Sequence, residues 1–502
     1  MSIQLLVTAV GCVAILALVQ SLLSPLRSIG GPFLARFTDL WYGWRVYSGH
    51  FEIENLELHK KHVRYGPNRF SFDDPDVLRT IYGPGSQFKK SDWYDAFNLP
   101  KPLAFEQWNI FSTTDPKLHS EQRKPFTSNY SMSALVSFEP YVDQCADIFD
   151  QRLTEVVDTG VPIDYSHWLQ CYAFDVIGDI TFGKRFGFLD SGHDVGGVMA
   201  ALDTSFTYSA TVGVFPSIHP YLFKLMGLAA GKKNTGMQYV NAFTEDSIKE
   251  FRNKPKTSKA ASENNTGMKP LLDKFFKKHE EDPAHFSSYH IYTGAATNVG
   301  AGSDTTGISL SATFYYLLKN PGTLRKLRDE IDDKSTQGQL SDRPTFKETQ
   351  GMPYLQAVIK EALRLHPATG LPLERVVPEG GAIILGRFFP EGTIVGVNTW
   401  VEHRNKQVWG EDAERFRPER WFTDDTERMG LMNRHWIPFG AGSRVCIGKN
   451  ISLLEMQKLI PRVVRDFNLE IEGGNHRTWD TLNHWFVKPI NFRVKVSKRK
   501  KE

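Results

Sequence analysis

The sequence predicts a mainly α-helical protein with small β-sheets, of the α+β class, and two stretches carry most of this prediction. Residues 284–318 follow a helical pattern for about thirty residues and end before Asn320 and Pro321, which stop helices. Residues 376–401 alternate β-branched and apolar side chains between glycine turns, as short strands do. We expect one large domain over residues 34–502, because no long disordered linker divides it.

An anchor, residues 1–23, precedes this domain, because residues 3–23 are uncharged, apolar and long enough for a transmembrane helix. The first cations, Arg27 and Arg36, follow it, so we expect the rest of the chain to stay in the cytoplasm. A cleaved signal peptide and a buried helix are the alternatives. Residues 24–33 contain two prolines and two glycines and are expected to form a stiff, non-helical hinge.

The overall composition excludes several classes of protein. A net charge of +3, from 60 basic and 57 acidic residues, gives no sign of a nucleic-acid-binding surface. The four cysteines, Cys12, Cys145, Cys171 and Cys446, are far apart and lack C-x-x-C spacing. This spacing argues against a disulfide framework and a structural zinc site, and a reducing compartment fits it.

Further elements follow from local patterns. Residues 63–72 predict a strand and a turn that lead into a helix at residues 76–82, and the sequence before Tyr65 is short for another strand. Residues 93–111 are rich in aromatic side chains and either pack in the core or line an apolar pocket. Apolar spacing over residues 132–188 is mostly helical, and the polar stretch 253–270 is expected to be an exposed loop.

The long helical pattern contains residues that disfavour a helix in its middle. Gly300, Gly302 and Gly307 each cost about 1 kcal/mol relative to alanine. The adjacent Thr305 and Thr306 are also poor helix formers. A helix that keeps these residues needs either close approach by a neighbour or a locally opened backbone that frees a carbonyl group.

One cysteine stands apart from the others, because Cys446 lies in the glycine-punctuated loop 439–448, FGAGSRVCIG, directly before an apolar helical run. The glycines allow tight turns that aim backbone amides at one sulfur atom, and a helix N-terminus also favours its thiolate form. This arrangement suits a metal ligand. The alternative is a buried free cysteine in a surface turn.

The spacing of Phe439, Gly442, Arg444, Cys446 and Gly448 resembles the haem-binding loop of the cytochrome P450 family, the haem-thiolate monooxygenases. The resemblance implies the cytochrome P450 fold, with the long central helix lying over haem b. It also implies that Cys446 is the axial thiolate ligand of the iron, that Arg444 faces a haem propionate, and that Phe439 packs beside the sulfur.

Ala301, Gly302, Asp304, Thr305 and Thr306 match the segment that the family places on the distal side of the haem. The resemblance implies that the Thr305 hydroxyl holds dioxygen and a water molecule, and that the Asp304 carboxylate relays protons inward. The alternative is a solvated aspartate beside a helix-bending threonine.

Three more residues match positions that meet the haem propionates in the family, namely His119, Arg123 and Arg375. His119 stands where many members have tryptophan, and it is still able to donate a hydrogen bond to a carboxylate. Without the family match, the i,i+4 pair of His119 and Arg123 is typical of a solvated helix face.

Glu361 and Arg364, in KEALRLHP, stand at i,i+3, and Arg420 follows in FRPERW. These motifs resemble the three-residue ion network that lies behind the cysteine loop in the family, and we interpret them as structural. The resemblance also places residues 368–373 and 483–486 beside the substrate.

The sequence therefore predicts a membrane-anchored monooxygenase in the endoplasmic reticulum membrane, with a single span and a cytoplasmic catalytic domain. Its substrate is expected to be an apolar small molecule, and membrane lipid but no nucleic acid is an expected partner. No glycine-rich dinucleotide fingerprint is present, so electrons from NADPH are expected through a separate NADPH–cytochrome P450 reductase. Arg444, Lys449 and Lys458 are cations that would favour such an acidic partner.

Two other functions stay open from the sequence. One is a haem-thiolate isomerase or dehydratase that acts on a peroxide, and the other is a non-catalytic haem protein. The segment GPFLARFTDLW and the histidine at position 119 are most similar to filamentous-fungal members of the family, including those that resemble pisatin demethylase. This similarity suggests secondary metabolism or detoxification.

Overall fold

The computed structural model describes residues 8, 11–12, 15, 18–60, 63–100, 109–230, 236–253 and 269–500. Most of the predicted span 3–23 and of the predicted loop 253–270 lies outside these residues, as do residues 101–108 of the aromatic segment. Within the described part of the chain, no helix has both the length and the apolar character that crossing a bilayer requires. The membrane anchor therefore stays a prediction.

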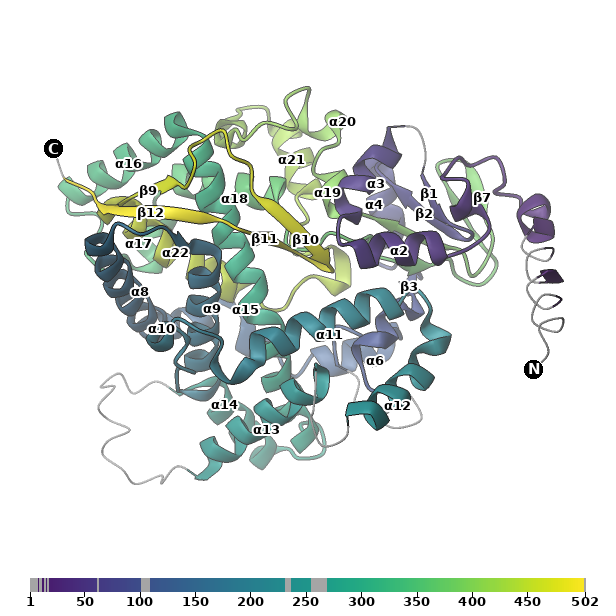
Figure 1. Cartoon of the computed structure of the whole chain (residues 1–502), viewed down its shortest axis with the longest axis horizontal. Helices are drawn as coiled ribbons and strands as arrows, with labels where there is room; N and C mark the ends of the chain where they lie inside the picture. The colour runs from purple at the N-terminus through teal and green to yellow at the C-terminus, as the bar shows by residue number, and fades with distance from the viewer. Residues whose placement is uncertain are drawn as a thin grey trace.

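A single long helix, α15 (Ser288–Lys319), runs through the middle of the molecule (Figure 1). The Ser287 side chain accepts a hydrogen bond from the His290 backbone amide, and the His290 side chain accepts one from the Ser287 backbone amide. This capping box starts the helix four residues later than predicted. Asn320 and Pro321 end it as predicted. Helices α9 (Tyr165–Phe182), α18 (Pro353–Leu365) and α22 (Lys449–Asp466) pack around α15.

Other α-helices surround this centre. Their bounds are α2 (Leu40–Ser48), α3 (Phe51–His59), α4 (Pro75–Tyr82), α6 (Pro116–Arg123), α8 (Glu139–Thr159), α11 (Val198–Val212), α12 (His219–Ala230), α13 (Met237–Asn253), α14 (Leu271–Glu281), α16 (Pro321–Thr336), α17 (Phe346–Gln350), α19 (Thr399–Glu402), α20 (Lys406–Trp409) and α21 (Thr426–His435).

The strands form small separate sheets, as the sequence predicts. The largest has the order β1-β2-β8-β5-β3, with β2 and β8 parallel and the other neighbouring pairs antiparallel. The other sheets have the orders β4-β12-β9, β10-β11 and β6-β7. The strands are β1 (Arg64–Gly66), β2 (Arg69–Phe72), β3 (Lys89–Lys90), β4 (Ile163–Asp164), β5 (Arg375–Val376), β6 (Ala382–Ile384), β7 (Arg387–Phe389), β8 (Ile394–Val397), β9 (Phe467–Ile471), β10 (Asp480–His484), β11 (Phe486–Ile490) and β12 (Arg493–Lys498).

One local prediction needs correction. Residues 63–72 form two antiparallel strands, β1 and β2, and not a single strand with a turn. The strand before the turn is present but only three residues long, which explains why its pattern is weak in the sequence. The following helix, α4, begins at Pro75 because the Asp74 side chain accepts a hydrogen bond from the Asp76 amide.

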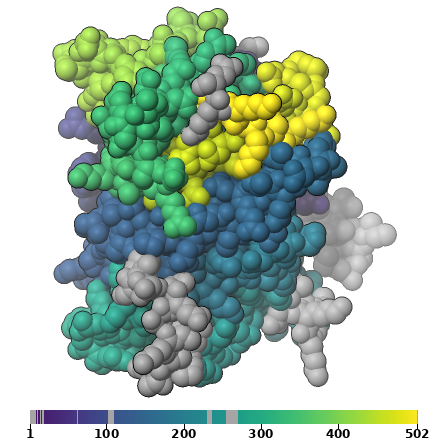
Figure 2. All heavy atoms as spheres, turned by 90° about the vertical axis from the view of Figure 1, so that its left-hand side faces the viewer, coloured from purple at the N-terminus to yellow at the C-terminus, as the bar shows by residue number. Residues whose placement is uncertain are grey.

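The main hydrophobic core lies between α8, α9, α15 and α22, with the C-terminal strands against it. Figure 2 shows this arrangement from the side, with the yellow C-terminal strands between the blue segment that contains α8 and the green segment that contains α16. A rigid helical centre of this kind positions the loop before α22 against the middle of α15.

The predicted hinge, residues 24–33, is irregular in structure but packs against the largest sheet. The Arg64 guanidinium donates to the carbonyl oxygens of Leu26 at 2.6 Å and Ile29 at 3.3 Å. Leu26 itself is buried in a hydrophobic cluster with strands β2 and β8. The segment is therefore held on the domain surface by specific contacts.

Candidate functional site

A cavity of about 400 Å³ lies in the centre of the domain. Residues of the 438–448 loop, α15, α11, α6 and the tip of the β10–β11 hairpin line it. Among the predicted site residues, the structure brings to its wall Phe439, Arg444, Cys446, His119, Arg123, Arg375 and Thr305. Its volume lies in the range of small-molecule binding sites.

The loop around Cys446 is shaped by glycines and closed by one backbone hydrogen bond. Gly442 has a φ of 65°, and a Cβ atom there would lie 2.0 Å from the carbonyl oxygen of Tyr82. No other residue fits this position without moving the backbone. The Cys446 amide donates to the Phe439 carbonyl at 2.8 Å, and α22 begins three residues later. The side chain of Cys446 borders the cavity and lies inside the protein.

The loop alone does not favour the thiolate form of Cys446, in contrast to the prediction. Burial raises the pKa of the thiol, and this effect outweighs the opposing effects of the Gly448 and Lys449 amides and of the Arg123 and Lys449 charges. The Gly448 and Lys449 amides do donate to the sulfur, as predicted. A bound metal cation would displace the proton, because only the thiolate is a ligand.

Cations gather at one part of the cavity wall. Arg375 is buried, and its guanidinium donates to the Glu374 carbonyl at 2.8 Å. Arg444 donates to the Thr113 carbonyl at 2.6 Å, and burial together with the charge of Arg375 lowers the pKa of Arg444 to about 10. Burial also lowers the pKa of Arg123.

Two further basic side chains lie beside these arginines. Burial and the nearby arginines lower the pKa of His119 to about 3, so its imidazole is neutral at pH 7 and still donates through one N–H. Lys90, which the sequence analysis missed, is buried with its ammonium group 3.9 Å from the centre of the Tyr94 ring. Burial, followed by the charges of Arg375 and Arg444, lowers the pKa of Lys90 well below its ordinary value.

None of the described residues that line the cavity is acidic. Burying cations without counter-ions costs free energy, so we expect this site to bind a ligand with negative charge. A thiol, a neutral imidazole N–H, three arginine guanidinium groups, the buried Lys90 amine and an otherwise largely apolar wall fit the iron, the two propionates and the porphyrin of haem. The residues present therefore fit the cofactor that the sequence resemblance implies.

Helix α15 stays regular beside the cavity, so its backbone is not opened there, and close approach explains Gly302 and Gly307 but not Gly300, where a Cβ atom would have room. A Cβ atom on Gly302 would lie 2.9 Å from Ile177, and one on Gly307 would lie 3.0 Å from the Cα of Gln170. The Thr305 hydroxyl lines the cavity and donates to the Ala301 carbonyl at 2.9 Å. The hydroxyl oxygen of Thr305 is therefore a polar group on the part of the cavity wall that α15 forms, and it is able to accept a hydrogen bond there.

Asp304 does not share the cavity with Thr305. It is 1 % exposed and does not line the cavity. The Lys488 ammonium lies 2.8 Å from one carboxylate oxygen of Asp304, and the Gln170 side-chain amide donates to the other. In this conformation the predicted relay from Asp304 to Thr305 is thus not assembled, because adjacent residues of a helix face different sides.

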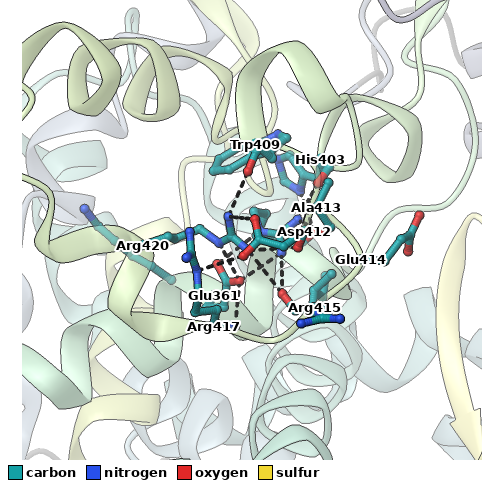
Figure 3. Close-up of polar contacts among 12 residues, drawn as sticks. Glu361, His403, Trp409, Asp412, Ala413, Glu414, Arg415, Arg417 and Arg420 are labelled. Carbon is teal, nitrogen blue, oxygen red and sulfur yellow. Dashed lines mark hydrogen bonds and ion pairs between the residues drawn. The ribbon is translucent and has the colours of Figure 1, made fainter.

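Glu361, Arg364 and Arg420 form one buried network (Figure 3). Glu361 accepts from the Arg364 guanidinium at 2.8 and 3.0 Å and from the Arg420 guanidinium at 2.8 Å. Arg364 also donates to the carbonyls of His403 and Ala413. The network joins α18 to the segment 403–421, and it lies away from the cavity lining, which fits a structural role.

The predicted docking cations need correction. Lys458 is buried, and its ammonium pairs with Asp143 at 2.9 Å and with Glu139 at 3.3 Å, so it is not available to a partner protein. Arg444 faces the cavity. Lys449 is partly exposed and lies over the rings of Trp436 and Phe439.

The sequence analysis missed Lys90 and Lys488. Lys90 lies in KKSDWYDAF, where a cation beside several aromatic residues is a weak signal of a buried charge. Lys488 had no local signal, because its partners Asp203 and Asp304 are far away in the chain. The tip of the β10–β11 hairpin does line the cavity as predicted, through Trp485 and Phe486.

Comparisons with known proteins agree with this geometry. The family model described as Cytochrome P450 matches residues 67–496. Pisatin demethylase from Fusarium vanettenii is 41 % identical over 477 residues, which cover 93 % of this chain and 90 % of that protein. A cytochrome P450 monooxygenase from Aspergillus terreus is 40 % identical over 460 residues, which cover 91 % of this chain and 92 % of that protein.

The fold also matches a solved structure. A crystal structure of a cytochrome P450, CYP102L1, superposes with a TM-score of 0.73 over 90 % of this chain and 96 % of that chain, at 19 % identity. The comparisons thus confirm the resemblance and the mainly helical fold that the sequence predicts. The chain belongs to the cytochrome P450 family, and it is an oxidoreductase of the monooxygenase type.

Proposed function

We propose that this monooxygenase oxidises an apolar, ring-containing small molecule that is held in the central cavity. The main support for this substrate class is the aromatic part of the cavity wall, formed by Phe97, Phe111, Phe206, Trp485 and Phe486. Their rings contact one another, with centroid distances from 4.7 to 6.4 Å. Such a wall favours flat apolar rings through stacked and edge-to-face contacts.

Haem bound at Cys446 would activate dioxygen, because the thiolate would raise the electron density of the iron. The residues of the chain prepare the site for that chemistry. Arg123, Arg375, Arg444 and Lys90 would neutralise the two propionates and orient the porphyrin. The Thr305 hydroxyl would hold a proton donor on the distal wall.

A polar group in the wall indicates one more property of the substrate. Asn98 is buried and lines the cavity, and its side-chain oxygen accepts from the Ser112 hydroxyl at 2.7 Å. The Asn98 amide nitrogen has no acceptor among the residues that the structure describes. A substrate oxygen at this position would satisfy the amide, so we propose a ring compound with at least one hydrogen-bond acceptor.

The biological setting is also part of the proposal. The fungal origin of the relatives supports a role in fungal secondary metabolism or detoxification. Because a 41 % identical relative is a pisatin demethylase, oxidative demethylation is the reaction to test first on this chain.

We further propose that the protein is anchored in the endoplasmic reticulum membrane with its catalytic domain in the cytoplasm, and that an NADPH–cytochrome P450 reductase supplies its electrons. Exposed apolar side chains support a membrane-facing end: Leu40 and Trp44 on α2, Phe388 on β7, and Tyr221 and Leu225 on α12. Figure 1 shows α2 and β7 in the half of the molecule next to residues 24–33, with α12 below them. Exposed apolar groups of this kind fit a lipid surface.

The catalytic part of this proposal is tested by turnover. The full chain is reconstituted with haem and a fungal reductase, and ring compounds are screened for a shift in the haem absorption. Hits should consume NADPH and oxygen in a one-to-one ratio and give an oxidised product. Product formation without NADPH or oxygen would instead identify a peroxide isomerase, and no turnover of any bound compound would indicate a non-catalytic haem protein.

Two variants complete the test. Cys446→Ala should lose the thiolate-type absorption, whereas Cys171→Ala, a buried cysteine outside the cavity lining, should keep it. An unchanged spectrum in Cys446→Ala would contradict the site. For the anchor, the full chain should sediment with lipid vesicles and a chain without residues 1–23 should do so less; equal sedimentation would refute this part of the proposal.

A further inference from the structure

One glycine of α15 is not explained by the packing of the protein. A Cβ atom on Gly302 or Gly307 would lie 2.9 or 3.0 Å from a residue of α9, so these two positions require glycine. At Gly300 the nearest atom to such a Cβ is the Cδ2 of Leu202, and their distance of 4.0 Å is an ordinary van der Waals contact. An alanine side chain would therefore fit at Gly300 without any movement of its neighbours.

The backbone does not require glycine at this position either. Gly300 lies inside the continuous helix Ser288–Lys319 and has no left-handed backbone angle. Inside such a helix glycine is less favourable than alanine, because glycine loses more conformational freedom on folding. The chain thus keeps a residue that weakens its central helix, and neither packing nor backbone geometry offsets this cost.

The missing side chain leaves space at the edge of the cavity. Gly300 lines the cavity together with Ala296 and Ala301 of the same helix, which have small side chains. Leu202 of α11 is buried and lines the cavity opposite Gly300. We call the space between these four residues the Gly300 gap.

The Gly300 gap continues the aromatic part of the cavity wall. Phe206 follows Leu202 by four residues on α11, so the two side chains lie on one face of the helix and about 6 Å apart along its axis. The Phe206 ring centroid lies 4.7 Å from that of Phe486 and 6.2 Å from that of Phe97. The distance from Phe206 to Leu202 exceeds the diameter of one six-membered carbon ring. A single ring that packs against Phe206 therefore leaves the gap unfilled.

A buried polar group independently indicates that a ligand binds at the aromatic wall. Asn98 follows Phe97 in the chain, is 4 % exposed and lines the cavity. The His219 imidazole donates to the Asn98 carbonyl at 3.1 Å and holds this residue in place. The Asn98 amide nitrogen has no acceptor among the residues that the structure describes. A ligand at the aromatic wall thus has a polar group to bind, and the gap leaves it room to extend.

We propose that Gly300 determines the size of the substrates that this monooxygenase accepts, because it leaves room for a second ring. The substrate class is a compound with at least two fused or directly linked rings. One ring packs against Phe206 and Phe486, and the next lies over Gly300. Gly300 is a specificity-determining residue and takes no part in the chemical steps. This inference rests on the ring-containing substrate proposed above and adds its size.

The stability of two alanine variants tests whether the protein itself needs Gly300. Gly300→Ala should raise the unfolding temperature of the haem-loaded protein by about 1 °C or more, because alanine fits and favours the helix. The matched control is Gly307→Ala, in the same helix and outside the cavity lining. It should lower the unfolding temperature, because its Cβ would lie 3.0 Å from the Cα of Gln170. Both temperatures are measured by circular dichroism without added ligand.

Binding is measured with two imidazoles of different size, which bind haem iron and change its absorption. 4-Phenylimidazole carries one phenyl ring, whereas bifonazole carries a phenyl and a biphenyl group. Gly300→Leu fills the gap with a side chain that also favours a helix. It should weaken bifonazole binding by about tenfold or more and change 4-phenylimidazole binding by less than about twofold. Gly300→Ala should show the same order of effects with a smaller loss.

A substitution on the opposite wall tests whether lost space is the cause. Leu202→Ala removes the side chain that faces Gly300. Combined with Gly300→Leu, it should restore most of the affinity for bifonazole, because the space returns on the other side of the gap. Haem content should be equal in all of these variants.

Four results would overturn the proposal. A lower unfolding temperature in Gly300→Ala would show that packing requires the glycine. Loss of haem in Gly300→Leu would show that the glycine makes room for the porphyrin. Equal effects of Gly300→Leu on the two imidazoles, or no rescue by Leu202→Ala, would show that ligands do not enter the gap. If the binding results hold but no ring compound is oxidised, the size rule stands and the proposed function fails.

Discussion

Removal of the charge on Glu361 should be among the most destabilising conservative substitutions in the chain. Glu361→Gln keeps the shape of the side chain but leaves the guanidinium groups of Arg364 and Arg420 buried without their anion. The new amide also places an N–H₂ group against donors, because both oxygens of Glu361 accept: one from Arg420 and the Arg417 amide, the other from the Trp421 indole. Breaking one partner of a buried ion pair costs about 3–5 kcal/mol.

The matched control is Glu419→Gln, the same substitution in an exposed pair. Glu419 accepts from Lys326 and from the Tyr354 hydroxyl, and its side chain is 38 % exposed. Exposed pairs contribute up to about 1 kcal/mol. The free energy of unfolding is measured for both variants by urea titration of the haem-loaded protein, with circular dichroism and haem absorption as separate signals.

The expected order is a loss of about 3–5 kcal/mol for Glu361→Gln and of about 1 kcal/mol or less for Glu419→Gln. Haem absorption should persist in folded Glu361→Gln, since the network does not line the cavity. Equal losses in the two variants would refute the reasoning that burial, and not the ion pair as such, makes the network costly to break.

Three further predictions follow from single residues. Gly442→Ala should destabilise the cysteine loop and weaken haem binding, because its Cβ has no room, whereas Gly440→Ala, where the nearest atom is 3.8 Å away, should have the smaller effect in a haem-retention assay. Burial raises the pKa of Glu52 to about 7 from its ordinary 4.5, so its contribution to stability is complete below pH 4.5 and is lost as the pH rises towards 7. The loss is about 3 kcal/mol, and Glu52→Gln but not Glu57→Gln should flatten this part of the pH profile of unfolding. Thr305→Ala should reduce product formation by about 100-fold while NADPH oxidation continues, measured as the ratio of product to NADPH.

Each of these has a contrary outcome. Equal haem retention in the two alanine variants would show that left-handed backbone strain alone governs the loop. An unchanged pH profile in Glu52→Gln would show that the pKa of Glu52 is the same in the folded and in the unfolded protein. An unchanged ratio of product to NADPH in Thr305→Ala would exclude the hydroxyl from proton delivery.

Much of the fold follows from local sequence signals. The bounds of α15 come from a capping box at Ser287 and a proline after Asn320, and both are short-range features of the chain. The cysteine loop is recognised for the same reason, because its glycines and Cys446 act within ten residues. Strands β1 and β5 are too short to carry a periodic pattern, so their pairing could not be predicted.

The charged groups show where prediction from the sequence fails. Asp304 and Thr305 are neighbours in the chain, but successive side chains of an α-helix point about 100° apart, so only one of them reaches the cavity. Lys458 was expected on the surface and is buried beside Asp143, because α22 packs against α8. No short-range pattern reports which face of a helix meets which neighbour.

The amino-acid sequence by itself determined the family, the class of fold, the cysteine that would bind the iron and the order of the motifs, since these depend on spacing along the chain. Only the tertiary structure decided which charges share a cavity, which are buried in pairs and which hold Asp304 away from Thr305. Those relations join residues that are hundreds of positions apart, such as Lys488 with Asp203 and Lys90 with Arg444. Their energies arise from burial and distance, and both exist only in the packed molecule.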